Sequence, residues 1–183
     1  MASKKDKLDD IVLMGDPVLK QVCEPVGEVT DEVRELAERM TEDMYAAEGC
    51  GLAAPQVGVP IRMIVVDCEY GGGTRKNPYV LIDPEIVELG DETEVGSEGC
   101  LSFPGVSVDV ERPKRVVVHA RNLEGDLMRY EADGSLLARC LQHEIDHLNG
   151  VVMLDHLGPI AKMRATQQVR QAIAAGVQPG ETD

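Results

Sequence analysis

Helical spacing of apolar residues marks three parts of the chain. From about residue 31 to residue 48, apolar side chains recur every three or four positions between acidic ones, with Thr30 or Asp31 as the cap and Gly49 as the stop. A second run, residues 136–149, lies between the cap residue Ser135 and Gly150. Residues 160–174 form a third run. We therefore predict helices over these three segments.

Runs of β-branched and apolar residues predict strands in the rest of the chain. They occur at residues 11–13, 61–67, 79–82, 85–89, 106–110, 115–120, 128–132 and 151–154, with turn-forming residues at 70–78 and 123–127. This order predicts an α+β fold in which short, mostly antiparallel strands pack around the helix at 136–149, with an N-terminal helix and a C-terminal helix. Residues 1–183 are expected to form a single catalytic domain with polar tails at about 1–8 and 175–183.

The central predicted helix carries the pattern His143-Glu144-x-x-His147. Residues four apart on a helix are offset by roughly 40°, so both imidazoles can reach one metal ion with the carboxylate beside them. On a helical wheel they share a side with apolar residues, and burial there is costly unless a metal ion or hydrogen bonds satisfy them. The opposite arc is mostly polar and holds Ala138, Arg139, Gln142, Asp146 and Asn149. The alternative interpretation, a pair of hydrogen-bonded core histidines, is the less favoured one at this spacing.

A catalytic site of the zinc type takes three protein ligands and one water, so a third ligand is needed. Downstream, Met153 stands where one protease class has its third histidine, which leaves Asp155 and His156 as weak candidates. Upstream, His119 lies in a strand-like run, whereas Cys100 follows a glycine in a segment that cannot be a regular helix. A thiolate binds soft and borderline cations well. From chemistry alone, a ligand role and a buried structural role for Cys100 are equally open.

Composition narrows the class of protein. The net charge of −15 argues against broad attraction to nucleic acid, and no direct DNA binding is expected. No stretch approaches the ~20 apolar residues of a membrane span, and the first residues lack the apolar run of a signal peptide. We therefore expect no membrane association and a cytoplasmic location. Five cysteines at irregular spacing are interpreted as free thiols or metal ligands.

Three segments together resemble the signature motifs of the peptide deformylase family, in the order in which that family has them. They are Gly49-Cys50-Gly51-Leu52-Ala53-Ala54-Pro55-Gln56, Glu98-Gly99-Cys100-Leu101-Ser102 and Gln142-His143-Glu144-Ile145-Asp146-His147. The resemblance spans roughly residues 8–170. One departure is Cys50, which occupies a position where the family usually has an aliphatic residue.

The resemblance implies a metal-dependent hydrolase that removes the N-formyl group from the formylmethionine at the start of newly synthesised polypeptides. It favours Cys100 as the third ligand beside His143 and His147. It also implies one divalent metal ion, with Fe²⁺ as the native metal and Zn²⁺, Ni²⁺ or Co²⁺ as possible substitutes. Glu144 would take a proton from the attacking water and deliver it to the departing amine.

The same resemblance suggests roles for residues around the metal. The Gln56 amide and the Leu101 backbone N–H would stabilise negative charge on the formyl oxygen. An ion pair between Glu98 and Arg112 would support the cysteine segment. Residues expected to bind the N-formylmethionyl nascent peptide or to line its methionine pocket are Gly49, Cys50, Gly51, Gly99, Leu136 and Cys140.

Other functions fit the motif at this stage. One is a deformylase specialised for another formylated substrate, and a second is an endopeptidase whose third ligand lies downstream. A third is a non-catalytic, metal-binding module associated with the ribosome. Lys162, Arg164 and Arg170 on the last predicted helix suggest that a ribosome contact is possible despite the acidic chain.

Overall fold

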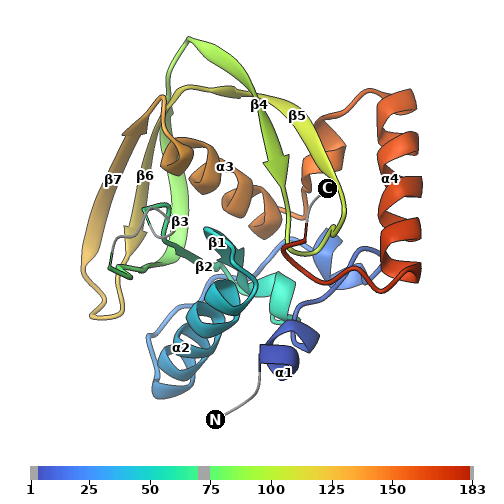
Figure 1. The fold of residues 1–183 in the computed structure, drawn as a ribbon. Helices are drawn as coiled ribbons and strands as arrows, with labels where there is room; N and C mark the ends of the chain where they lie inside the picture. Colours follow the sequence, from blue (N-terminus) through green and yellow to red (C-terminus); the bar gives the residue numbers. More distant parts are fainter. Residues whose placement is uncertain (1–3, 70–74, 182–183) are drawn as a thin grey trace.

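The computed structural model describes residues 4–69 and 75–181, and the chain folds as two sheets around one helix (Figure 1). A five-stranded antiparallel sheet has the strand order β1-β2-β3-β6-β7, and β4 pairs with β5 in a separate hairpin. The strands are β1 (Gly51–Ala53), β2 (Met63–Val66), β3 (Tyr79–Leu89), β4 (Thr93–Gly99), β5 (Ser107–Pro113), β6 (Arg115–Arg121) and β7 (Leu127–Asp133). The helices are α1 (Lys4–Asp9), α2 (Asp31–Ala46), α3 (Leu136–Leu148) and α4 (Pro159–Ala174), with short 3-10 turns η1 (Pro17–Lys20), η2 (Ala54–Val57) and η3 (Met153–His156).

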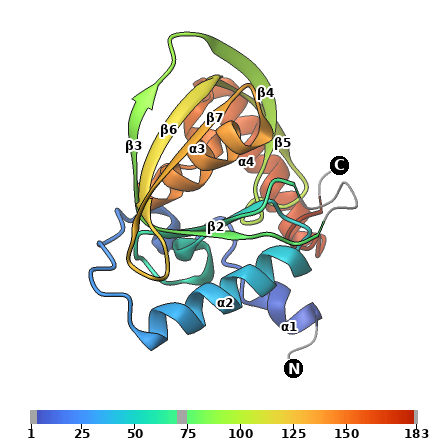
Figure 2. The same cartoon turned by 90° about the vertical axis from the view of Figure 1, so that its left-hand side faces the viewer.

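Strand β2 is buried on both faces because helices cover each side of this part of the sheet. On one face, Met63 and Val65 pack in an apolar cluster with Met40 and Met44 of α2. On the other face, Ile64 and Val66 pack in the cluster that contains the apolar residues of α3. Alternate side chains of a strand point to opposite faces, so a continuous apolar run is the expected pattern here. Figure 2 shows α1 and α2 on one side of β2 and α3 on the other. The α+β prediction with a central helix is confirmed.

Helix α3 is surrounded by protein on nearly all sides. Its apolar side, with Leu141, Ile145 and Leu148, packs against the five-stranded sheet. The arc that the helical wheel showed as mostly polar is also largely covered, because the β4–β5 hairpin lies across it (Figure 1). Buried Gln142 donates from Nε2 to the Pro113 carbonyl oxygen at 2.9 Å. The polar residues of this arc thus hold the helix to the hairpin.

Several predicted elements differ from the structure. Residues 11–13 are irregular backbone and not a strand, because Val12 N–H bonds to the Gln56 carbonyl and Met14 N–H to the Ser102 carbonyl, two different segments. Residues 151–154 do not form a strand either, and the 3-10 turn η3 begins at Met153. Strand β4 was not predicted, and the strands expected at 79–82 and 85–89 are one strand with two register shifts in its pairing with β6. Part of the loop expected at 70–78 lies outside the described residues.

Both polar tails contain ordered structure within the described residues. Residues 4–9 form α1, whose Lys7 Nζ lies 2.6 Å from Glu42 Oε2 of α2. At the other end, the chain turns back after α4, and Gly105 N–H donates to the Glu181 carbonyl at 2.7 Å. In the N-terminal tail, Leu8 is buried in the cluster with Met40 and Met44 of α2, and such burial favours an ordered segment. Among the described helices, none has the length and apolar character to cross a membrane.

Asp43 on α2 is a local source of instability. Its side chain is 1% exposed, and within the described residues its Oδ2 has no hydrogen-bond partner. Burial, with a smaller effect of Asp10, raises its pKa from 3.8 to about 6. The folded protein therefore binds this proton more tightly than the unfolded chain does. Its stability is reduced at neutral pH and recovers as the pH falls from about 6 towards 4.

We expect Asp43→Asn to raise the free energy of unfolding by about 1–3 kcal/mol at pH 7.5, with the gain shrinking towards zero near pH 4. Urea unfolding at the two pH values measures this difference. Glu38→Gln on the exposed face of α2 is the control and should change little at either pH. A gain of equal size at both pH values would contradict the electrostatic explanation.

Candidate metal centre and its pocket

Cys100, His143 and His147 converge on one buried point. The two histidines are one helical turn apart on α3, and Cys100 follows directly after β4. One ligand atom from each residue lies within 4.8 Å of the others, and Cys100 Sγ is 3.3 Å from His147 Nε2. The two imidazole rings are 5.1 Å apart, measured between centroids, and meet edge to face. The three side chains thus form one potential metal site.

The tautomer of His143 is set by a buried carboxylate. His143 Nδ1 lies 2.9 Å from Glu98 Oε2, which leaves Nε2 for the centre of the site. Arg112 donates from Nε to Glu98 Oε1 at 2.7 Å and from Nη2 to Glu98 Oε2 at 3.0 Å. Arg139 donates from Nη1 to Glu98 Oε1 at 2.9 Å. Burial opposes the charge on Glu98, but the hydrogen bonds from His143 and Arg112 outweigh it and hold its pKa below the ordinary range. The ion pair expected from sequence is therefore part of a larger network.

This network connects the β4–β5 hairpin to α3 and to η3, the 3-10 turn that follows α3. Arg112 Nη1 bonds to Asp146 Oδ2 at 2.7 Å, and Asp146 Oδ2 also lies 2.8 Å from His156 Nε2. Arg139 also donates to the Val110 carbonyl at 2.9 Å. The helical wheel placed Arg139 in the mostly polar arc and gave no role to it. Its position four residues before His143 was the available signal, since such residues share a helix face.

The surroundings of the two histidines act differently on their pKa values. Burial lowers the pKa of His147, which keeps that imidazole neutral and able to coordinate. Burial acts in the same direction on His143, but Cys100 and Glu98 raise its pKa well above the ordinary value. A site that stabilises a proton between a thiol and a carboxylate also favours a metal cation. Sulfur and imidazole nitrogens suit a borderline divalent ion such as Fe²⁺ or Zn²⁺.

Glu144 lies beside this donor set with a free oxygen. It is 5% exposed, and among the described residues its Oε2 has no hydrogen-bond partner. Burial raises its pKa to about 8. Gly51 of β1 packs against it so closely that a Cβ there would lie 2.5 Å from Glu144 Oε1. The glycine lets the strand backbone pass directly over the carboxylate.

Gln56 reaches the same point from η2. Its Oε1 accepts a hydrogen bond from Ala53 N–H at 2.8 Å, which fixes the orientation of the amide. Its Nε2 then faces Ser102 Oγ at 3.2 Å and Cys100 Sγ at 3.4 Å. Leu101, the next residue after Cys100, is buried and lines the pocket described below. An amide donor and a backbone segment therefore border the metal centre.

A pocket of about 370 Å³ opens onto this centre. Its wall includes the glycines at 49, 51 and 99, together with Cys50, Leu136, Glu144 and His143. Cys140 does not line it, because its thiol lies behind Gly51 at 2.7 Å from the Cβ position there. Two further lining residues, Glu48 and Gly180, were not predicted. A Cβ on Gly180 would lie 1.9 Å from the Ala47 carbonyl oxygen, so the returning C-terminal segment can form this rim only with glycine.

The other candidate ligands lie away from the centre. Among the described residues, the groups able to hold a metal do not include His119, Asp155 or His156. Asp155 instead makes ion pairs with Lys20 and Lys162. His156 contacts Asp146, as described above. A downstream third ligand, which an endopeptidase on the same motif would need, is therefore not supported.

Comparison with known proteins points to one family. A family model described as polypeptide deformylase matches residues 8–163. The chain is 46% identical to a peptide deformylase of Bartonella bacilliformis over 157 residues, which cover 83% of this chain and 86% of that relative. It is also 46% identical to one of Acinetobacter baumannii over 163 residues, covering 89% and 90% of the two chains.

Solved structures of peptide deformylases are similar to this chain as well. A peptide deformylase from Legionella pneumophila superposes with a TM-score of 0.84 and 37% identity, covering 91% of this chain and 95% of that one. One from Synechococcus elongatus in complex with actinonin has a TM-score of 0.82 and 43% identity, covering 92% and 91%. The likeness extends through the segments that carry the metal centre.

We expect Glu98→Gln to weaken metal binding by about 10- to 100-fold, because the neutral amide no longer balances two arginines or fixes His143. Metal content after dialysis against a series of chelator concentrations measures the effect. The control is Glu85→Gln, which changes an exposed glutamate on β3. Unchanged metal affinity in folded Glu98→Gln protein would remove Glu98 from its supporting role.

Proposed function

The chain belongs to the peptide deformylase family and removes the N-formyl group from newly synthesised polypeptides, and we propose that Glu144 beside the Cys100–His143–His147 centre carries the reaction. The observation that supports this most directly is the free, buried Glu144 oxygen beside a sulfur-and-imidazole donor set in an open pocket. We also propose that residues 1–183 act as a single catalytic domain.

A divalent metal ion held by Cys100, His143 and His147 would supply Lewis-acid chemistry, making water more acidic and polarising the formyl carbonyl. Glu144 accepts the proton of the attacking water as the new C–O bond forms. It then gives that proton to the peptide nitrogen as the C–N bond breaks, which releases formate and a free α-amine. One carboxylate beside the reacting water can accept this proton and return it, because Glu144 has an oxygen without a hydrogen-bond partner among the described residues.

Gln56 and Leu101 are proposed to stabilise the negative charge that develops on the formyl oxygen. The Gln56 amide is already oriented by Ala53, so little reorganisation is needed to direct Nε2 at that oxygen. The Leu101 backbone N–H is the second proposed donor. Losing one such donor costs on the order of 3 kcal/mol of transition-state stabilisation.

The substrate backbone is proposed to lie along Gly49, Gly51 and Gly99 in an extended conformation. These glycines line the pocket, and Gly51 leaves no side chain between the peptide and Glu144. The methionine side chain would contact Cys50 and Leu136, which is 56% exposed and offers apolar surface. Cys140 packs against Gly51 and does not line the pocket, so we propose that it acts on the substrate only by positioning Gly51.

Fe²⁺ is the metal that we propose in the cell, with Zn²⁺, Ni²⁺ or Co²⁺ able to occupy the same donors. A thiolate with two imidazoles accepts all of these ions, so the donor set supports this range. Elemental analysis of protein purified without oxygen, compared with protein purified in air, distinguishes them. We also propose a cytoplasmic location, which is supported by free thiols at all five cysteines.

We expect Glu144→Gln to lower the kcat for hydrolysis of a formyl-methionyl peptide by about 10²- to 10⁴-fold, because the amide cannot carry the proton. The assay is made without oxygen on iron-loaded protein, with Glu85→Gln as the control. Bound metal should be retained. A fully metallated wild-type protein that releases no formate from this peptide would contradict the proposed substrate, and a panel of other formylated molecules would then identify a specialised enzyme.

The exposed face of α4 is proposed to contact the ribosome. Arg164 and Arg170 are exposed there, while Ala165 and Val169 on the opposite face are buried in the core. Deleting α4 would therefore damage the fold, and charge reversal is the sharper test. We expect Arg164→Glu with Arg170→Glu to weaken salt-dependent ribosome binding by at least about tenfold while leaving peptide hydrolysis unchanged. Co-sedimentation with ribosomes at two salt concentrations measures this, and equal binding by both proteins would contradict it.

A further inference from the structure

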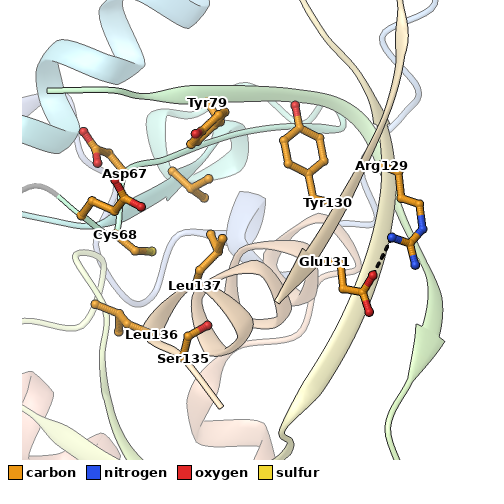
Figure 3. Close-up of a pocket in the computed structure, with 11 residues that line it drawn as sticks. Asp67, Cys68, Tyr79, Arg129, Tyr130, Glu131, Ser135, Leu136 and Leu137 are labelled. Atoms are coloured by element: carbon orange, nitrogen blue, oxygen red, sulfur yellow. Dashed lines mark hydrogen bonds and ion pairs between the residues drawn. The ribbon is translucent and has the colours of Figure 1, made fainter. Parts of the chain in front are cut away.

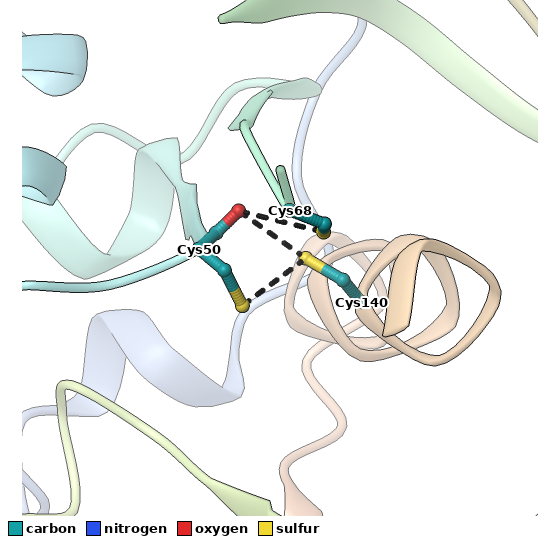
Figure 4. A group of neighbouring side chains, drawn as sticks. All are labelled: Cys50, Cys68 and Cys140. Carbon is teal, nitrogen blue, oxygen red and sulfur yellow. Dashed lines mark hydrogen bonds between the residues drawn. The ribbon is translucent and has the colours of Figure 1, made fainter. Parts of the chain in front are cut away.

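A second group of sulfur ligands lies next to the catalytic pocket. Cys50 precedes β1, Cys68 follows β2 and Cys140 lies on α3, yet their Sγ atoms are all within 4.8 Å of one another (Figure 4). The Sγ atoms of Cys50 and Cys140 are 4.0 Å apart. Three different elements thus bring three thiols to one point.

The contacts among these thiols are long. Cys140 Sγ and Cys68 Sγ both approach the Cys50 carbonyl oxygen, at 3.6 Å and 3.9 Å. Thiols are weak hydrogen-bond donors, and one carbonyl shared by two of them offers little stabilisation. The hydrogen bonds among the reduced thiols are therefore weak, and the group can accept another partner.

The spacing fits a tetrahedral thiolate site. A Zn–S bond of about 2.3 Å places two sulfurs of one tetrahedron about 3.8 Å apart, close to the observed separation of Cys50 and Cys140.

A cation can reach this group from a second pocket. That pocket, of about 470 Å³, is lined by Cys68 and by Leu136, which also lines the catalytic pocket (Figure 3). Among the described residues, its lining includes the carboxylates of Asp67, Glu69 and Glu131 and the guanidinium of Arg129. Carboxylate oxygens and the Cys68 sulfur thus line the same pocket, and both are donors that a divalent cation can use.

We propose that Cys50, Cys68 and Cys140 form a second metal site for a soft divalent cation of the Zn²⁺ type, and that an ion bound there inhibits the enzyme. Cys140 Sγ and Glu144 Oε1 both crowd the same point above Gly51, at 2.7 Å and 2.5 Å from its Cβ position. Glu144 is therefore a carboxylate close to Cys140, although the ligand group itself consists of the three sulfurs. A cation held by those sulfurs attracts the Glu144 carboxylate and makes it a poorer acceptor for the proton of water. The inhibition rests on the proposed function, whereas the binding does not.

The test uses protein whose catalytic site is loaded with Ni²⁺, to which Zn²⁺ is added in the presence of a competing chelator and a reductant that does not bind metal. Elemental analysis is expected to find one Zn²⁺ per chain in addition to Ni²⁺. Hydrolysis of the formyl-methionyl peptide should fall on the order of 100-fold as this Zn²⁺ binds. Bound Zn²⁺ should also protect Cys50, Cys68 and Cys140 from alkylation, measured residue by residue.

Cys68→Ala removes one thiol without altering the pocket of the metal centre. We expect it to keep its Ni²⁺ and basal rate and to lose at least about tenfold in Zn²⁺ affinity, because one of three ligands is gone. Cys68→Ser serves as a second variant if the first folds poorly. Cys23→Ala, which removes a buried thiol outside the group, should behave as wild type.

Three results would overturn the site: no additional Zn²⁺, replacement of Ni²⁺ one for one, or equal Zn²⁺ binding by Cys68→Ala. If no additional Zn²⁺ binds, the three thiols are not a metal site and interact only through weak hydrogen bonds. Additional Zn²⁺ with an unchanged rate would overturn the inhibition. If the protein hydrolyses no formyl peptide at all, the proposed function fails, but the Zn²⁺ count and the alkylation pattern still decide whether the second site exists.

Discussion

The buried carboxylate of Glu98 is the interaction on which the rest of the site depends. An ionised carboxylate removed from water is costly unless several donors satisfy it. Here two arginines and a histidine do so, and they come from two elements: Arg112 from β5, and Arg139 and His143 from α3. Because the charge must be balanced, the hairpin cannot move away from the helix. The same contacts orient His143 and place Cys100, two residues beyond Glu98.

The packing of β1 on α3 is the second constraint. Gly51 allows the strand backbone to run directly against Glu144 and Cys140. This close approach shields the carboxylate from water, which raises its pKa, and leaves the pocket open on the other side. Catalytic proton transfer and the shape of the pocket thus have one structural cause.

The two cysteine-containing groups differ in chemistry although both adjoin the same helix. Cys100 works with two imidazoles, whose neutral nitrogens suit several borderline metals. Cys50, Cys68 and Cys140 offer sulfur alone, which favours softer or more thiophilic ions. Their different donor sets make it reasonable for one protein to keep a catalytic ion and respond to another.

The sequence by itself determined the central helix and the chemistry on it. Helical periodicity, the Ser135 cap and the spacing of His143 and His147 are local, so they could be recognised without knowing what packs nearby. The α+β class and most strands followed from similar local patterns. Periodicity failed where non-local bonds decide the backbone, as at residues 11–13 and 151–154, and at polar β4, whose alternation is interrupted by glycines.

Only the tertiary structure decided what surrounds the motif. From chemistry alone, Cys100 was equally a ligand or a structural thiol until the fold placed its sulfur 3.3 Å from His147. Arg139 received no role from the sequence because a helical wheel does not show that a hairpin covers its polar arc. The meeting of Cys50, Cys68 and Cys140 was equally invisible, since residues far apart in sequence become neighbours only through long-range strand pairing and helix packing. Local spacing specifies which chemical groups are available, and packing specifies which of them meet.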